Sequence, residues 1–429
     1  AVVGIDFGTL HSKAVVVVVV ANSELDLLLT LTSQIGVARH RGIDIITNED
    51  RIAQHRTFYP PDPALPWHSF DFPRSLVAFG PKVRSIGEAA KTQETSNFKN
   101  TIGCLQRCIG RTLNDKQILE FEKKFINAKL IDVDGTVGVE VRPTDPVVSV
   151  PASDQRCPSI QVRYLNETHQ FSYTQIVGMY LGKLRDIASA ELKVGVSDVV
   201  IAVPGWYTDI QRRALLDAGA IANLNILRLI NDTTATALGY GITKTDLPEP
   251  ENPRHVAFVD VGHATLSVAI VAFSKGQLKV LGTAYDHNLG GRDIDYALIQ
   301  HFANEFKTKY KIDVLSNQKA VFRLQVACEK LKKVLSANTE SVMNVESLMN
   351  DIDATSKLTR EELEALIAPL LEGVKAPIER AIAASGLTLE QIDAVELIGG
   401  STRVPAVKAK IQEAFGGKTL SFTVNQDEG

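Results

Sequence analysis

The chain has 429 residues, of which 45% are hydrophobic and 22% are charged, and its formal net charge is -4. One ordinary hydrophobic core does not extend over such a length, so we expect two or three domains. The near balance of charge does not favour nucleic acid or an anionic membrane as a partner, and four cysteines are too few for a disulfide scaffold.

We expect the apolar stretch near the start to be neither a signal peptide nor a membrane span. No basic region precedes the valine run at 15–20, and Asn22, Glu24 and Asp26 interrupt the apolar residues that follow. The composition fits a reducing compartment, so we expect a cytoplasmic protein, with the nucleus as a second location.

Strand and helix patterns alternate along the chain. Buried strands are short apolar runs that end in turn residues, and helices show apolar residues three and four apart. In chain order we predict a strand over 1–9, two strands over 34–49, a hairpin over 129–141, a helix over 173–193, a strand over 197–208, a helix over 209–224, a three-strand meander over 255–286, helices over 319–338 and 359–386, and a strand, turn and helix over 393–416.

The same plan occurs twice. Residues 2–49 and 255–286 each begin a three-strand meander that opens with Asp-x-Gly. We therefore predict two mixed α/β lobes, 1–245 and 246–429, with the last residues returning to the first lobe. A ligand would lie between the lobes, held by one hairpin from each.

The two hairpin loops read DFGT (6–9) and DVGHAT (260–265). Glycine lets backbone N–H groups approach a phosphate, the threonine hydroxyl adds a donor, and the aspartate can hold Mg²⁺ through water. One Asp-x-Gly-Thr also occurs in ordinary turns. The pair of them, each opening a meander, predicts a phosphate site.

Three further motifs support a nucleotide. GGSTRVP (399–405) is a turn that can bring backbone and Arg403 to a sugar or base, although plain strand-to-helix turns look alike. ACEKLKKVLS (327–336) places charged side chains on one helix face, which is either a solvated face or an adenosine clamp. NDTTATALGYG (231–241) supplies Asp232 as a third carboxylate near the metal.

These motifs together resemble the nucleotide-binding domain of the heat-shock protein 70 chaperone superfamily. The resemblance implies the actin-like ATPase fold, which is α/β with two ribonuclease-H-like lobes and a nucleotide cleft between them, and ATP or ADP with Mg²⁺ as cofactors. It covers nearly the whole chain. Its most specific pieces are GIDFGT, NDTTATALGYG, GGRDID, EKLKKVLSAN and GGSTRVP.

The resemblance also assigns residues. The catalytic positions it implies are Asp6, Asp232, Asp260 and Thr265. The metal-side carboxylates, acting through water, are Asp6, Asp260 and Asp427. The nucleotide-binding positions are Gly8, Thr9, Leu10, Gly262, His263, Gly290, Gly291, Glu329, Lys332, Lys333, Ser336, Gly399, Gly400, Ser401 and Arg403.

Details are most similar to the branch of 110-kDa heat-shock proteins. Leu10 follows Thr9 where the typical chaperone has a second threonine, and His263 and Ala264 stand where it has glycines. This branch implies an ATP-binding cochaperone that acts as nucleotide exchange factor for heat-shock protein 70 chaperones. Unfolded clients would bind only through a C-terminal half outside this sequence, and neither nucleic acid nor membrane is an expected partner.

One departure from the family pattern concerns ATP hydrolysis. Both branches carry a lysine in the stretch that matches 100–111, and counting along it puts Gln106 at that place, with Arg107 as a one-residue alternative. Gln cannot supply the positive charge, and loss of one preorganised donor costs on the order of 10²–10³ in rate. We predict ATP binding with weak ATPase activity at most.

Three segments of about twenty residues, near 14–34, 50–73 and 142–162, do not fit the family pattern. Removing the first or the third joins its flanks into a smooth hairpin. We interpret them as translated introns from an imperfect gene model, with real surface loops as the alternative. The valine run at 15–20 can take the place of the second strand and displace 35–40.

Three rival functions remain. One is a chaperone ATPase that hydrolyses ATP to capture peptides, and another is a small-molecule kinase of the same fold. The third is a product of misannotation that folds poorly. The rate of ATP turnover distinguishes the chaperone ATPase, and a binding site for a phosphoryl acceptor distinguishes the small-molecule kinase.

Overall fold

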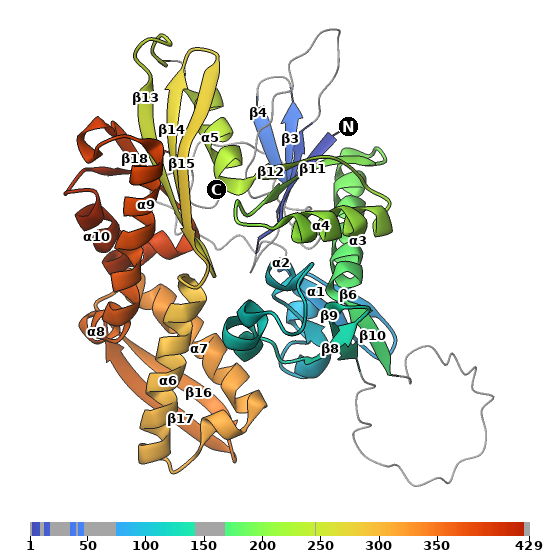
Figure 1. Ribbon diagram of the computed structural model, residues 1–429. Coiled ribbons are helices and arrows are strands. Elements are labelled where there is room, and N and C mark those ends of the chain that lie inside the picture. Colours follow the sequence, from blue (N-terminus) through green and yellow to red (C-terminus); the bar gives the residue numbers. More distant parts are fainter. Residues whose placement is uncertain are drawn as a thin grey trace.

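The computed structural model describes residues 2–8, 13–17, 35–39, 42–46, 74–141, 168–244 and 246–423. Figure 1 shows two groups of strands and helices side by side, each built on its own large sheet. We call the described residues up to 244 lobe I and those from 246 onward lobe II. The mixed α/β fold class is confirmed, whereas the exact boundary near residue 245 stays a prediction. Among the described helices, none is long and apolar enough to cross a membrane.

The large sheet of lobe I has a parallel centre. β1 (Val2–Asp6) lies parallel to β11 (Asp198–Val203) and antiparallel to β2 (Lys13–Val17). The apolar runs VVGID and DVVIAV are largely buried, as expected for strands covered on both faces. The strands in spatial order are β12 (Asn225–Asn231), β11 (Asp198–Val203), β1 (Val2–Asp6), β2 (Lys13–Val17), β3 (Ile35–Arg39) and β4 (Gly42–Ile46).

Part of the valine run forms the second strand of this sheet. β2 includes 15–17, and β3 is displaced to the third position, where Val37 pairs in parallel with Val16. The predicted displacement is therefore confirmed for these residues. The predicted three-strand meander is wrong here, because a meander needs antiparallel neighbours throughout. The rest of the three odd segments, 18–34, 50–73 and 142–162, lies outside the described residues.

Two small sheets and several helices complete lobe I. The capping box of Ser172 and Gln175 starts α3 (Tyr173–Leu192), and buried side chains such as Ile176 and Ile201 join helix and sheet in one core. The small sheets contain β5 (Val77–Phe79), β6 (Arg84–Ile86) and β7 (Thr101–Ile102), then β8 (Lys129–Val133), β9 (Thr136–Val141) and β10 (His169–Ser172). The helices are α1 (Glu88–Lys91), η2 (Phe98–Asn100), α2 (Leu105–Cys108), η3 (Gln117–Glu122), η4 (Lys123–Phe125), α3 (Tyr173–Leu192), α4 (Asp209–Ile221) and α5 (Asp232–Thr243).

Lobe II has a five-stranded sheet in which the predicted meander is confirmed. Its order is β15 (Gln277–Asp286), β14 (Leu266–Ser274), β13 (Arg254–Val261), β18 (Ala394–Ile398) and β19 (Leu420–Ser421). A separate hairpin contains β16 (Glu340–Met349) and β17 (Ile352–Thr359). The helices are α6 (Gly291–Lys309), η5 (Val314–Ser316), α7 (Gln318–Ala337), α8 (Arg360–Leu371), η6 (Glu372–Val374), α9 (Lys375–Ser385), η7 (Leu389–Gln391), η8 (Gly400–Arg403) and α10 (Pro405–Ala414).

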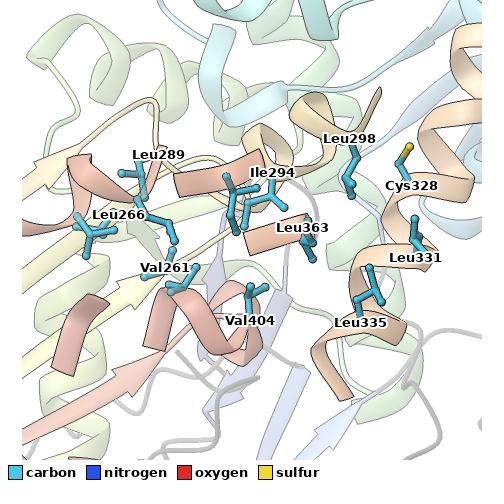
Figure 2. Packing of buried hydrophobic residues seen from close by; sticks show 14 of the residues in the cluster. Val261, Leu266, Leu289, Ile294, Leu298, Cys328, Leu331, Leu335, Leu363 and Val404 are labelled. Atoms are coloured by element: carbon cyan, nitrogen blue, oxygen red, sulfur yellow. The ribbon is translucent and has the colours of Figure 1, made fainter. Parts of the chain in front are cut away.

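The core of lobe II supports the second hairpin loop. Figure 2 shows Val261 and Leu266, which flank this loop, packed in one cluster with Leu289 and Ile294. All four side chains are at most 5% exposed. Burial of such side chains contributes about 1.5–3 kcal/mol each, so the loop starts and ends at fixed points.

Strand direction brings the acidic residues to comparable places in the two lobes. In lobe I, Asp6 ends β1 and Asp232 follows β12, which runs parallel to the neighbouring β11. In lobe II, Asp260 is near the end of β13, and Gly399 follows the parallel strand β18. The carboxyl ends of parallel strands are where open α/β sheets bind ligands.

Candidate functional site

The first hairpin loop is held by contacts from elsewhere in lobe I. The hydroxyl of Ser75 donates to the carbonyl of Gly8 at 2.9 Å. The side-chain amide of Gln106 donates to the carbonyl of Phe7, directly after Asp6. Gln106 therefore reaches the predicted phosphate turn. Thr9 and Leu10 lie outside the described residues.

The second hairpin loop joins two other predicted turns through one carbonyl. The oxygen of Gly262 accepts from the backbone N–H of Gly291 at 3.0 Å and from the hydroxyl of Ser401 at 2.8 Å. The N–H of Gly262 in turn donates to the carbonyl of Thr265 at 3.0 Å, which closes the loop. Three motifs that lie far apart in the sequence thus meet at one point.

Glycine is required at two positions in these turns, Gly290 and Gly399. A Cβ atom on Gly290 would lie 2.5 Å from the carbonyl oxygen of His263, and one on Gly399 would clash with Oδ1 of Asp260. Gly399 also has a φ of +83°, which side chains rarely adopt. A Cβ atom on Gly400, by contrast, would meet nothing within 4 Å. The turn is therefore tightly packed at Gly399 and open at Gly400.

At the carboxyl ends of the sheets, Asp6 and Asp260 lie close enough to Asp232 to affect its pKa. Burial raises the pKa of Asp232 to about 7, and the negative charges of Asp260 and Asp6 add to this rise. The N–H of Thr233 donates to Asp232 at 2.6 Å and partly opposes it. A divalent cation would relieve the mutual repulsion of these carboxylates, so the donor chemistry fits Mg²⁺.

The fit is to a cation held through water. Among the described residues, no group of three or more acidic, histidine or cysteine side chains could hold a metal ion directly. Mg²⁺ usually keeps several of its waters, so such a group is not required. Asp427, the third predicted metal-side carboxylate, lies outside the described residues.

The helix motif on α7 faces the same turns through Lys332. Its buried ammonium donates to the carbonyl of Gly291 at 3.0 Å and pairs with Asp295 at 2.7 Å. The neighbouring positions contact one another: Lys333 pairs with Glu329 at 2.9 Å, and the hydroxyl of Ser336 donates to the carbonyl of Lys332. The structure therefore brings Lys332 to the glycine turn.

Glu329 and Arg403 complete the account of the predicted nucleotide residues. Burial would raise the pKa of Glu329, but the charges of Lys333 and Arg74 outweigh it and hold the pKa at about 2. Glu329 is thus an anion on α7, with Arg74 of lobe I at 3.9 Å. Arg403 ends η8 and is exposed.

A buried arginine lies beside the second loop, and the sequence suggested it only as the alternative to Gln106. Arg107 is 0% exposed and donates to the hydroxyl of Thr265 at 3.2 Å and to the carbonyl of His287 at 2.7 Å. It also pairs with Glu122 at 2.8 Å. Gln106 and Arg107 therefore divide the site, since the first contacts the loop of lobe I and the second contacts the loop of lobe II.

The sequence reasoning missed Glu122, Arg292 and the aromatic side chains around them. Burial, with the charges of Arg107 and Arg111, lowers the pKa of His287 to about 4, and this imidazole stands edge-on to Trp206 with ring centres 4.7 Å apart. The one available signal was Arg292 within the motif GGRDID, where a charged residue follows two glycines at the start of a helix.

Comparisons with known proteins point in the same direction. A family model described as Hsp70 protein matches residues 2–429. The heat shock protein hsp88 of Neurospora crassa is 48% identical over 428 residues, which are 100% of this chain and 52% of that protein. A heat shock protein homolog of Saccharomyces cerevisiae is 47% identical over 397 residues, which are 92% of this chain and 52% of that protein.

A more distant relative agrees. The 97 kDa heat shock protein of Strongylocentrotus purpuratus is 42% identical over 403 residues, which are 93% of this chain and 40% of that protein. The chain spans about half the length of the first two curated relatives that it matches.

Proposed function

Because this chain belongs to the Hsp70 protein family, with large heat shock proteins among its relatives, we propose that its two lobes bind ATP or ADP with Mg²⁺ and form the nucleotide-binding part of a cochaperone. The resemblance to this superfamily and its 110-kDa branch is confirmed. Members of the family bind ATP or ADP with Mg²⁺ in general. For this chain, nucleotide binding and its consequences are the proposal.

One observation carries the proposal most directly: the shared carbonyl of Gly262. It links the second hairpin loop, the glycine turn before α6 and the GGST turn before α10 through Gly291 and Ser401. Backbone N–H groups at such turns are the usual donors to phosphate. Lys332, which is paired with Asp295, donates to the carbonyl of Gly291 and fixes the same turn.

The residues present fit the cofactor. Asp6, Asp232 and Asp260 would hold the hydrated metal, and the glycine turns would hold the phosphates. Glu329, Lys332, Lys333 and Ser336, on one face of α7, would hold the adenosine. When bound, Mg²⁺ supplies positive charge that offsets the phosphates.

Weak hydrolysis follows from the two residues at the predicted lysine position. Gln106 contacts the first loop without a charge. Arg107 brings a charge to Thr265, but Glu122 already pairs with it. We therefore propose retention of nucleotide and slow turnover, with an ATP-hydrolysing chaperone as the second candidate because of the Arg107 contact.

The proposed partner is a heat-shock protein 70 chaperone, and the proposed location is the cytoplasm. In this proposal, bound ATP keeps the two lobes together, and the closed form engages the chaperone so that the chaperone releases its ADP. The whole-length relatives have further segments, so client binding is not assigned to this half.

The test is release of fluorescent ADP from a heat-shock protein 70 chaperone, with and without this chain and ATP. We expect faster release only when this chain carries ATP. Asp260→Asn should lose the effect, whereas Glu140→Gln, outside the site on β9, should keep it. Unchanged release by a chain that does bind ATP would contradict the cochaperone role and leave a simple nucleotide-binding domain.

A further inference from the structure

Glu122 joins the two lobes through a fully buried ion cluster. This carboxylate at the end of η3 in lobe I is 0% exposed. It accepts from Nε of Arg107 at 2.9 Å within lobe I, and from the two terminal nitrogens of Arg292 at 2.7 and 2.9 Å across to lobe II. Two guanidinium groups from different lobes therefore share one carboxylate.

Charge and burial make this carboxylate hard to neutralise. Burial alone would raise the pKa of Glu122, but hydrogen bonds and charges from Arg292 and Arg107 outweigh it and hold the pKa at about 2. The carboxylate is therefore ionised at neutral pH. Removing one partner of a buried ion pair leaves an uncompensated charge, which is far more costly than never having built the pair.

Aromatic rings of lobe I accommodate the surplus positive charge. The guanidinium of Arg292 lies over Phe125 at 4.2 Å from the ring centre, and that of Arg107 lies over Trp206 at 5.0 Å. Cation–π contacts of desolvated groups are individually favourable. Arg292 thus loses two contacts with lobe I, a carboxylate and a ring, if the lobes separate.

The cluster lies directly behind the predicted phosphate turns. Arg292 follows Gly291, and its backbone N–H donates to the carbonyl of His263 at 2.8 Å. Arg107 reaches the hydroxyl of Thr265 and the carbonyl of His287, both in lobe II. Opening the lobes here must break these two contacts of Arg107 together with the Glu122–Arg292 pair.

We propose that Glu122, Arg107 and Arg292 form an interlobe latch that holds the lobes closed and determines how slowly bound nucleotide leaves. Glu122 and Arg292 act as positioning residues, since they work through the loops rather than on the nucleotide. The part that concerns nucleotide release rests on the proposed function, whereas the part that concerns lobe closure does not.

The kinetic test uses Glu122→Gln, which keeps the size of the side chain and removes its charge. We expect the dissociation rate of a fluorescent ATP analogue to rise on the order of tenfold or more, with little change in the association rate. Arg292→Gln should act likewise, and the double variant should show much less than the product of the two single effects. Such coupling is what a shared contact produces and what general destabilisation does not.

Two matched variants serve as controls. Gln318→Ala removes an exposed hydrogen bond between the lobes, from its side chain to Asn127 at 2.7 Å, and should leave the dissociation rate unchanged. Glu140→Gln makes the same chemical change as Glu122→Gln, at an ion pair with Lys129 inside lobe I. If Glu122→Gln does not fold, Arg292→Lys keeps the charge but loses the paired donors and takes its place in the test.

A second measurement needs no nucleotide. Spin labels at Val83→Cys in lobe I and Val342→Cys in lobe II, which are 66% and 63% exposed in the wild type, report the distance between lobes. We expect a broader and longer distribution in Glu122→Gln. Unchanged distances together with an unchanged dissociation rate would overturn the latch. Altered distances in a chain that binds no nucleotide would support lobe closure by the latch and contradict the nucleotide site instead.

Discussion

The side-chain amide of Gln106 donates a hydrogen bond to the carbonyl of Phe7, the residue directly after Asp6. This contact places Gln106 on the predicted first phosphate turn, at the position where the family resemblance implies a lysine. A neutral amide holds the turn but supplies no positive charge to a transferred phosphate. The relationship therefore connects a single residue to the proposed slow hydrolysis.

Gln106→Lys should raise the rate of ATP hydrolysis. A preorganised cationic donor at the phosphate accelerates such reactions on the order of 10²-fold, so single-turnover hydrolysis is the measurement. Gln106→Met, which is of similar length and uncharged, is the control and should stay slow. No acceleration in the lysine variant, with ATP binding intact, would mean that Arg107 already supplies the charge.

Adjacent glycines of the GGST turn should respond differently to alanine. Gly399→Ala places a Cβ against Asp260 and imposes a side chain on a φ of +83°, so we expect a loss of about 1–3 kcal/mol in the free energy of unfolding. Gly400→Ala points a Cβ into open space and should stay within about 0.5 kcal/mol of the wild type. Urea denaturation measures both, and equal losses would contradict the geometry of this turn.

Much of the fold could be predicted because its signals are local. The apolar periodicity marked α3 within one residue at its end, and the meander of β13, β14 and β15 followed from short apolar runs that end in turn residues. The helix expected over 359–386 is wrong in one respect, because η6 (Glu372–Val374) separates α8 from α9. Pro369, which lacks an N–H, was the signal for weakness there.

The rest depended on contacts between distant residues. The ion pair of Glu122 and Arg292 joins positions 170 residues apart, and no periodicity reports such a pair. The order of β2 and β3 depended on which apolar run pairs with β1, and runs of similar β-propensity compete for that place. The glycine motifs did point to turns that meet in the structure, at the carbonyl of Gly262, whereas their role in binding nucleotide stays a prediction.

Lys332 has a structural role that can be separated from its proposed role in nucleotide binding. Lys332→Met leaves Asp295 buried without its cation, and we expect a loss on the order of 3 kcal/mol in stability together with weaker ATP binding. Adding Asp295→Leu should restore the stability but not the affinity. Calorimetric unfolding and nucleotide titration measure the two effects, and restored affinity in the double variant would assign Lys332 to the fold alone.

The loss of folding stability at acidic pH should depend largely on the buried Glu122 carboxylate. Its pKa in the folded protein is about 2, below the ordinary value of 4.5, so the ionised form stabilises the fold above about pH 4.5. This stabilisation, on the order of 3 kcal/mol, is lost as the pH falls from about 4.5 toward 2. Glu122→Gln should flatten the pH dependence of the urea midpoint over that range.

The control for this prediction is Glu361→Gln, at an exposed position in the first turn of α8. It should keep the wild-type slope, because the change of residue type is the same and the buried arginine partners are missing. Identical slopes in all three proteins would mean that the arginines do not hold the pKa of Glu122 below its ordinary value.

The most direct test of the nucleotide site is ATP titration by calorimetry, with and without Mg²⁺, on this chain and on Asp260→Asn. The account predicts micromolar or tighter binding with Mg²⁺. It also predicts affinity at least about tenfold weaker when Mg²⁺ is removed and little Mg²⁺ dependence in Asp260→Asn. Absence of binding by the folded wild-type chain, or the same Mg²⁺ dependence in both proteins, would contradict it.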